Sequence, residues 1–403
     1  MICAAEAVIV PISGTTATEI VGGVRDLIAS GELTPRDLLP PVRTLAAELG
    51  VNRNTVAAAY RQLVAAGVAA THGRGGTMLL NATTAARPRP NAPGHITPRK
   101  EPPAMFTGLS AFPLTPMSES GIDEQAYAWL VARLASAGVD SIGALGSTGS
   151  YAYLSREQRA RAARIAVEAA EGTPVIVGIG ALRTSQVLAL AEDAQKAGAS
   201  AVLLAPMTYQ PLTEDEVFGL YEDVTRELSV PLCVYDNPNT THVHFTDELH
   251  ARIAGLPQVA AIKIPPVPDE AAAAKERVQA LRALVPDTVS IGVSGDRAAA
   301  TGLTAGCAAW YSVVGGLFPR TALALTRAAQ SGDAELATAL SERLQPLWEL
   351  FRHHGSLRVI SGAASHLGLA SETNLPLPLR GLAPEARDRL VTVLDGLDLD
   401  VSS

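Results

Sequence analysis

Eight short apolar runs alternate with helical stretches between residues 106 and 314, and this alternation constrains the fold more than any other feature of the 403-residue chain. The runs occupy residues 106–113, 141–146, 174–180, 201–206, 231–235, 259–264, 289–293 and 310–314. Strands that alternate with helices form parallel sheets, and eight such units are typical of a (β/α)8 barrel. A doubly wound open sheet is the alternative architecture. Further helical stretches after Pro319 predict extra C-terminal helices.

The first 80 residues show a different, mainly helical pattern. Apolar residues recur at helical spacing in two segments that end at Gly31 and Gly50, and a third helix begins after Asn52. The third helix has one apolar face, formed by Val56, Tyr60 and Leu63. Helices joined by a short turn, followed by a Gly-rich segment at 68–80 that can fold as a hairpin, predict a helix-turn-helix domain.

A segment rich in Pro and polar residues, 81–103, separates the two parts. X-Pro steps disfavour helix, so this segment is predicted to be a semi-extended linker. The predicted organisation is a mainly α-helical domain at residues 1–80, a linker at 81–103 and an α/β barrel domain at 104–403.

The charges are unevenly distributed. The net charge is −8, yet residues 1–103 carry ten basic and seven acidic side chains, against 22 and 33 in the remainder. This asymmetry favours contact of the first part with nucleic acid. No apolar run reaches the roughly 20 residues of a membrane helix. The first 24 residues have no Lys or Arg of a secretory signal, and the three cysteines form no C-x-x-C pair. We therefore expect a cytoplasmic protein without a membrane partner or metal site.

The polar face of the third helix carries Arg53, Asn54 and Arg61. Arg and Asn side chains can pair with guanine and adenine edges, and a helix fits the major groove of DNA. A solvated face on a small helical domain is the alternative. The segment LPPVRTLAAELGVNRNTVAAAYRQLVAAGV, followed by a Gly-rich stretch, resembles the GntR family of winged-helix transcription regulators over residues 18–80.

This resemblance implies a winged helix-turn-helix domain that binds a DNA operator, expected to be palindromic. The implied DNA contacts are Arg43, Asn52, Arg53, Asn54, Thr55, His72, Gly73 and Arg74. The sequence departs from the family at Val42, where a small polar residue is usual, and at Ala57, where a basic residue is frequent. These departures concern affinity for DNA rather than the fold.

Polar residues stand at three predicted strand ends, and barrels place their chemistry at the C-terminal ends of strands. The second strand runs into Gly146-Ser147-Thr148-Gly149, a loop whose N–H groups and hydroxyls suit a carboxylate or phosphate, with an ordinary turn as the alternative. Tyr235 ends the fifth strand, and Lys263 follows 28 residues later in the sixth. Adjacent strands would hold the two residues about 5 Å apart. A phenol beside a desolvated amine suits Schiff-base chemistry, whereas a lone lysine is more often a snorkelling residue.

The motifs GSTGS, YDNP and AIK, in this order, resemble the dihydrodipicolinate synthase/N-acetylneuraminate lyase family over residues 106–394. The resemblance implies a class I aldolase barrel in which Lys263 condenses with pyruvate or another 2-keto acid while Tyr235 shuttles protons. It implies that Ser147, Thr148 and Gly149 bind the keto acid, with Thr148 also catalytic, and that no cofactor is needed. It also implies homotetramers built from pairs of barrels, and we expect a homo-oligomer, either a dimer or a tetramer.

Three positions depart from this family. Thr240 stands where the synthases carry an arginine, and Ser150 stands where a glutamate is common. Met207-Thr208 occupies the place of a tyrosine donated across the dimer, although Tyr209 is adjacent. The departures argue against lysine biosynthesis and favour an aldolase, lyase or dehydratase that acts on another 2-keto acid.

The other candidate residues give weaker evidence for a functional site. His242, His244 and His250 lack the spacing of a metal site and are expected at the surface. Asp296 fits a helix N-cap as well as a substrate ligand. Regulators of this DNA-binding type are also fused to pyridoxal-phosphate aminotransferase folds, but the barrel motifs argue against that cofactor on Lys263.

Three functions stay open. The chain is a regulator whose barrel is a working keto-acid lyase, a regulator whose barrel only senses a keto acid or aldehyde, or an enzyme with a vestigial DNA-binding domain. The pair of Tyr235 and Lys263 favours a reactive barrel, and Arg43 and Arg53 oppose a vestigial domain.

Overall fold

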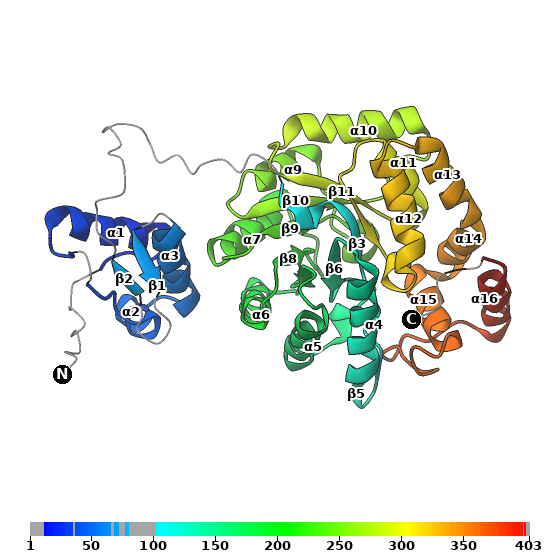
Figure 1. Cartoon of the computed structure of the whole chain (residues 1–403), viewed down its shortest axis with the longest axis horizontal. Helices are drawn as coiled ribbons and strands as arrows, with labels where there is room; N and C mark the ends of the chain where they lie inside the picture. Colours follow the sequence, from blue (N-terminus) through cyan, green and yellow to red (C-terminus); the bar gives the residue numbers. More distant parts are fainter. Residues whose placement is uncertain are drawn as a thin grey trace. The chain divides into compact units, whose positions relative to one another are not determined.

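The computed structural model describes residues 12–34, 37–65, 68–71, 77–79, 102–397 and 399. The chain divides into two compact units, one made chiefly of residues 1–97 and one made of almost all of residues 98–403 (Figure 1). The segment 80–101, which is most of the predicted linker, lies outside the described residues. No helix among those described is long and apolar enough to cross a membrane.

The first unit has three helices and a two-stranded antiparallel sheet. These elements are α1 (Ala17–Ser30), α2 (Val42–Leu49), α3 (Arg53–Ala65), β1 (Ala69–Thr71) and β2 (Thr77–Leu79). Thr16 and Glu19 form a capping box that begins α1, and left-handed Gly31 and Gly50 end α1 and α2. The predicted apolar face of α3 is buried in a core shared with α1 and α2. The expected helix-turn-helix followed by a hairpin is confirmed.

The second unit is built on a closed barrel of eight parallel strands, so the doubly wound alternative is excluded. The strands are β3 (Gly108–Ala111), β6 (Ser141–Ala144), β7 (Val175–Gly178), β8 (Ala201–Leu204), β9 (Leu232–Tyr235), β10 (Val259–Ile264), β11 (Ser290–Ser294) and β12 (Ala309–Ser312). Each strand pairs with its neighbour in chain order, and β12 closes the barrel by pairing with β3. Each of the eight apolar runs of the sequence contains or overlaps one of these strands.

Helices surround the barrel as a ring in Figure 1. The ring consists of α4 (Glu124–Ala137), α5 (Arg156–Ala169), α6 (Thr184–Ala197), α7 (Glu214–Arg226), α9 (Asp247–Ala254), α10 (Ala271–Leu284), α11 (Ala299–Thr304) and α12 (Pro319–Gln330). The predicted extra helices are α13 (Ala334–Arg343), α14 (Gln345–His354), α15 (Ser356–His366) and α16 (Pro384–Leu397). A small hairpin, β4 (Met117–Ser118) and β5 (Gly121–Ile122), lies between β3 and α4.

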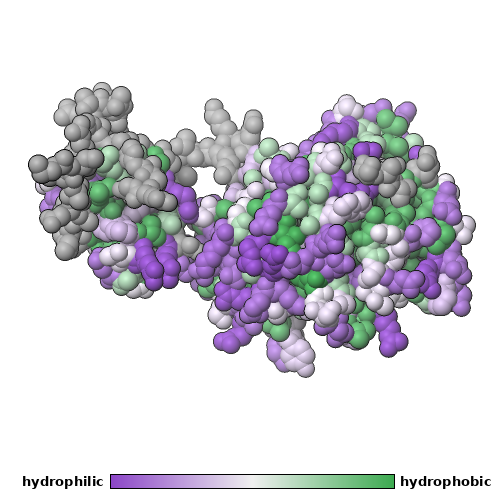
Figure 2. Space-filling view, turned by 60° about the horizontal axis from the view of Figure 1, so that its bottom comes forward, coloured by the Kyte–Doolittle hydropathy of each residue, from purple (hydrophilic) through white to green (hydrophobic). Residues whose placement is uncertain are grey.

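The barrel interior is filled by side chains from alternate strand positions, as expected for a sheet that closes on itself. Phe112, Cys233, Tyr235 and Tyr311 belong to this interior cluster. On the outer surface, polar residues are spread widely, with apolar residues grouped between them (Figure 2). A group that the strand ends place in the barrel interior is thus surrounded by buried, mainly apolar side chains.

Candidate functional site

Lys263 and Tyr235 lie side by side at the end of β10 and β9. The two Cα atoms are register partners in the parallel ladder, which confirms the prediction from the 28-residue interval. The Lys263 side chain is buried, and its Nζ lies 4.0 Å from the centre of the Tyr235 ring. The amine is thus held against a phenol in the interior of the barrel.

Two further aromatic rings enclose the Lys263 amine. Its Nζ lies 4.0 Å from the centre of the Phe112 ring and 5.4 Å from that of Tyr311. Both rings occupy space that glycines leave open. A Cβ atom on Gly143 would lie 2.3 Å from the Phe112 ring, and one on Gly292 would lie 2.5 Å from Tyr311. Neither aromatic was among the predicted site residues, because the signal for both lies in glycines on neighbouring strands.

Burial lowers the pKa of the Lys263 amine from 10.5 to about 7, because the ammonium form loses its hydration inside the barrel. Cys233 and Asp296 act in the opposite direction. Near neutral pH a large fraction of the amine is therefore uncharged and nucleophilic.

The Tyr235 hydroxyl is tied to two polar side chains. Asn237 Nδ2 lies 2.8 Å from Tyr235 Oη and 3.5 Å from Ser147 Oγ. Burial raises the pKa of Tyr235 to about 12, and hydrogen bonds with Ser147 and Asn237 lower it. The phenol thus keeps its proton at neutral pH and can donate it to a group bound at Lys263.

The loop after β6 brings the predicted keto-acid residues to the same end of the barrel. Ser147 is partly buried, and Thr148 is buried. A Cβ atom on Gly149 would lie 3.0 Å from the Leu145 backbone, so only glycine fits without a shift there. Ser150, the residue in place of a glutamate, is buried in a left-handed conformation with φ 53°. Ser147 is the member of this loop that the structure joins to the Tyr235 network.

Asp296 has a different role from the two expected for it. Its buried carboxylate accepts hydrogen bonds from Trp310 Nε1 at 3.0 Å and from the N–H groups of Val313 and Val314 at 3.1 and 2.7 Å. Gly295, not Asp296, holds the N-cap position of the following turn. Asp296 therefore anchors the loop that follows β12.

The expectation of three surface histidines is wrong for one of them. His242 and His244 are exposed, but His250 is fully buried and stacks on Phe245 with 5.0 Å between ring centres. Its Nε2 lies 3.4 Å from Asp236 Oδ2. Helix α9 turns this residue inward, which the spacing of the histidines did not reveal. Within the described residues, no group of three or more His, Cys, Asp or Glu side chains could hold a metal ion.

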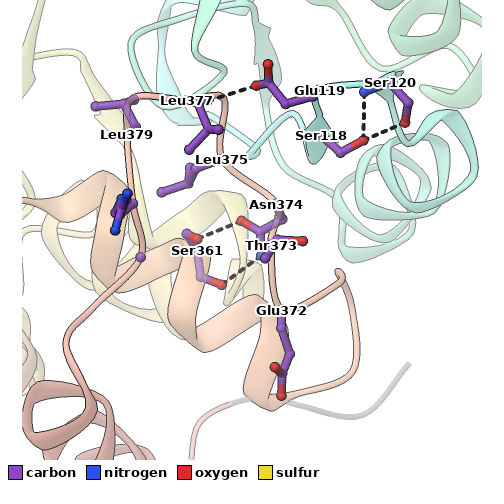
Figure 3. A pocket seen from close by; sticks show the side chains of 12 residues that line it. Ser118, Glu119, Ser120, Ser361, Glu372, Thr373, Asn374, Leu375, Leu377 and Leu379 are labelled. Carbon is purple, nitrogen blue, oxygen red and sulfur yellow. Dashed lines mark hydrogen bonds between the residues drawn. The ribbon is translucent and has the colours of Figure 1, made fainter.

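One cavity of the second unit has a wall that does not include Lys263. It measures about 670 Å³ and lies between the β4–β5 hairpin and the segment that precedes α16 (Figure 3). Polar groups in its wall bond one another: Asn374 with Ser361, and Glu119 with the N–H of Leu377. A smaller cavity of about 240 Å³ is lined by Asp236 and Ile264, among others. Since successive strand residues alternate in direction, it faces away from Lys263.

The positions that depart from the synthase pattern supply no cation to the site. Thr240 is exposed on the short helix α8 (Pro238–Thr241), where its hydroxyl donates to the Asn237 carbonyl. Tyr209 is 88% exposed. Neither residue brings the positive charge that a second carboxylate would need.

The predicted DNA contacts gather on the first unit. Arg43 is exposed on α2, and Asn52 and Arg53 are exposed at the beginning of α3. Asn54 and Thr55 follow in the first turn of α3, and the side chain of Asn54 lies outside the described parts. His72, Gly73 and Arg74 also lie outside the described residues. A helix that exposes Asn and Arg at its N-terminal end can present them to base edges.

Comparisons with known proteins find relatives of both the barrel and the first unit. The model of the dihydrodipicolinate synthetase family matches residues 105–396, and that of bacterial regulatory proteins of the gntR family matches residues 16–79. A 4-hydroxy-tetrahydrodipicolinate synthase of Hyphomonas neptunium is 32% identical over 298 residues, which are 73% of this chain and 100% of that protein. A similar synthase of Methylococcus capsulatus is 31% identical over 287 residues, 70% of this chain and 96% of that protein.

Solved structures resemble the second unit in the same way. The crystal structure of a dihydrodipicolinate synthase from Agrobacterium tumefaciens matches with a TM-score of 0.71 and 46% identity, over 73% of this chain and 99% of that one. A putative dihydrodipicolinate synthetase from Pseudomonas aeruginosa matches with a TM-score of 0.66 and 29% identity, over 72% and 99% of the two chains.

Proposed function

Because the chain belongs to the dihydrodipicolinate synthetase family and carries a gntR-family regulatory domain, we propose that it is a DNA-binding regulator whose barrel is a class I aldolase or lyase acting on a 2-keto acid. The observation that carries the proposal is Lys263, a buried amine with a pKa of about 7 in register with Tyr235. An uncharged amine and a protonated phenol can supply the nucleophile and the proton donor that imine formation requires.

The proposed reaction begins with attack of Lys263 Nζ on the C2 carbonyl carbon of pyruvate or a related keto acid. The carbonyl oxygen takes a proton from Tyr235 and, after a second proton transfer, leaves as water to give the imine. Loss of a C3 proton from the imine gives an enamine, a carbon nucleophile for a second carbonyl compound. The same steps in reverse cleave a carbon–carbon bond.

The loop after β6 is proposed to hold the carboxylate of the keto acid. Ser147, Thr148 and Gly149 offer hydroxyls and N–H groups at the strand end next to Tyr235. Thr148 is proposed to act in catalysis by orienting the keto acid toward Lys263. With exposed Thr240 in place of an arginine, the second substrate is proposed to be a carbonyl compound other than the substrate of lysine biosynthesis.

The test uses pyruvate as the only substrate. The full-length protein is incubated with pyruvate and borohydride, and the intact mass and the modified peptide are determined. In parallel, exchange of the pyruvate methyl protons in D2O is followed by NMR. Each methyl group that loses a proton to form the enamine regains a deuterium from the solvent. A covalent adduct on the peptide that contains Lys263, together with catalysed exchange, supports the proposal. Absence of any adduct at saturating pyruvate contradicts it.

The rate of imine formation is expected to depend on pH through the amine. Since burial holds the pKa of Lys263 at about 7 rather than 10.5, the neutral fraction increases as the pH rises toward 7 and levels off above it. Trapping by cyanoborohydride at limiting pyruvate should therefore increase about tenfold per unit below the pKa and reach a plateau near pH 8. A rate that keeps increasing up to pH 10 would show that the pKa of Lys263 is close to the usual 10.5 and would contradict the prediction.

The first unit is proposed to read DNA through α3. Arg53 at the beginning of this helix is placed to contact a base edge, so Arg53→Ala should weaken binding by about 1–3 kcal/mol and relax specificity at one position. The measurement is a titration at fixed salt with DNA selected by the wild type from a random pool. Arg25→Ala, which removes an exposed charge from α1, is the matched control. Equal losses in both variants would contradict a base-reading role.

The gntR-family domain favours a second candidate function, a regulator whose barrel senses a keto acid without turnover. A ligand-responsive regulator requires that pyruvate change the affinity for DNA, with a coupling of about 1–3 kcal/mol. DNA titrations with and without pyruvate, on the wild type and Lys263→Ala, measure this coupling. Proton exchange without further turnover, together with coupling, identifies the sensor. Equal affinities in all four conditions leave two independent functions on one chain.

A further inference from the structure

Asn237 stands in a helix N-cap position but does not use its side chain as a cap. It precedes α8, and asparagine is among the preferred residues there because its side-chain oxygen accepts from the first turn. In this chain, the Asn237 side chain makes no capping bond. Its backbone carbonyl accepts the N–H groups of Thr240 and Thr241 instead, at 3.1 and 3.0 Å. The amide is thus free to turn toward the barrel.

The amide group of Asn237 joins two hydroxyls that come from different strand ends. Its Nδ2 donates to Tyr235 Oη at 2.8 Å and lies 3.5 Å from Ser147 Oγ, across 90 residues of sequence. An amide nitrogen carries two hydrogens and can donate to both oxygens at once. Since the Tyr235 oxygen accepts this bond, its own hydrogen stays available to a group at Lys263.

We propose that Asn237 is a positioning residue that orients the Tyr235 hydroxyl for proton transfer at Lys263 and links it to Ser147. The proposal rests on the Schiff-base function proposed above. The bond occupies one lone pair of the phenolic oxygen and holds this oxygen in place, so that its proton can pass to a group bound at Lys263. In agreement, the hydrogen bond with Asn237 lowers the pKa of Tyr235 against the effect of burial.

Asn237 is expected to affect proton transfer and not the nucleophile. Loss of the Asn237 amide should leave the nucleophile in place, because Lys263 contacts Phe112, Tyr235 and Tyr311. Pyruvate binding should persist, because the loop after β6 keeps its hydroxyls and N–H groups. The step that suffers is proton transfer through Tyr235. The effect therefore falls on the rate constant at saturating pyruvate and leaves the KM for pyruvate nearly unchanged.

The experiment compares Asn237→Leu and Asn237→Asp with the wild type. Leucine removes the amide at similar size, and an ionised aspartate keeps the shape but can only accept hydrogen bonds. Both should slow methyl-proton exchange of pyruvate by about tenfold, the typical effect of one lost hydrogen bond. The fraction of protein trapped by borohydride at saturation should be unchanged. Asn239→Leu, at an exposed position on the same helix, should behave as the wild type.

The same substitutions in a Tyr235→Phe background separate positioning from a merely structural role. Without the phenol, Asn237→Leu should have no further effect on exchange, because its effect passes through Tyr235 Oη. An equal loss in both backgrounds, or wild-type exchange in both Asn237 variants, overturns the proposal. If Asn237→Leu fails to fold, Asn237→Asp decides in the same way. A wild type that forms no adduct with pyruvate instead overturns the proposed function itself.

Discussion

Lys263→Ala should abolish reductive trapping of pyruvate while the barrel remains folded. The amine is the only group on β10 that can form the imine, and alanine matches the small Ala260 and Ala261 that precede it in the strand. The chain contains four lysines, at positions 100, 196, 263 and 275, so peptide mapping assigns an adduct without ambiguity. The expected result is complete loss of the adduct and of pyruvate proton exchange.

The control for this variant is Lys275→Ala. Lys275 is exposed on α10, outside the barrel interior, so its loss should leave trapping and exchange at the level of the wild type. An adduct that persists in Lys263→Ala would place the nucleophile elsewhere. Thermal unfolding of both variants checks that a loss of trapping is chemical. Removal of the buried amine also removes a destabilising contribution at neutral pH, because the unfolded state binds the Lys263 proton more tightly than the folded state.

Tyr235→Phe should slow turnover by about 10²–10⁴-fold, the range for loss of a general acid–base group. The ring keeps its packing against Lys263, so the fold and the low pKa of the amine should persist. What disappears is the hydroxyl proton that the carbonyl oxygen needs before it leaves as water. The measurements are the rate of imine trapping and the rate of pyruvate proton exchange at saturation.

Tyr153→Phe serves as the matched control, since Tyr153 is 48% exposed near the loop after β6. Loss of its hydroxyl should change neither rate. An undiminished rate in Tyr235→Phe would remove Tyr235 from the mechanism and would leave proton transfer to another group. Together with Lys263→Ala, the variant separates loss of the nucleophile, which removes the adduct, from loss of the proton donor, which slows its formation.

Sequence periodicity determined the architecture of this protein. The barrel follows from apolar runs that alternate with helical stretches, because each run needs burial on both faces of a parallel sheet. The pairing of Tyr235 with Lys263 follows from one βα repeat, since parallel neighbours place equivalent positions at the same height. The three N-terminal helices and the hairpin follow in the same way from helical spacing and from glycine at helix ends.

Only the tertiary structure decided where the remaining side chains point. The sequence position of Asn237 is typical of a helix cap, yet its side-chain amide donates a hydrogen bond to the Tyr235 hydroxyl and makes no capping bond. Asp296 reads as a cap or a ligand, yet it anchors the loop after β12. His250 was expected at the surface and is buried. These outcomes depend on the direction in which each side chain leaves the backbone, and a sequence pattern carries no information about that direction when the contacts come from the tertiary fold.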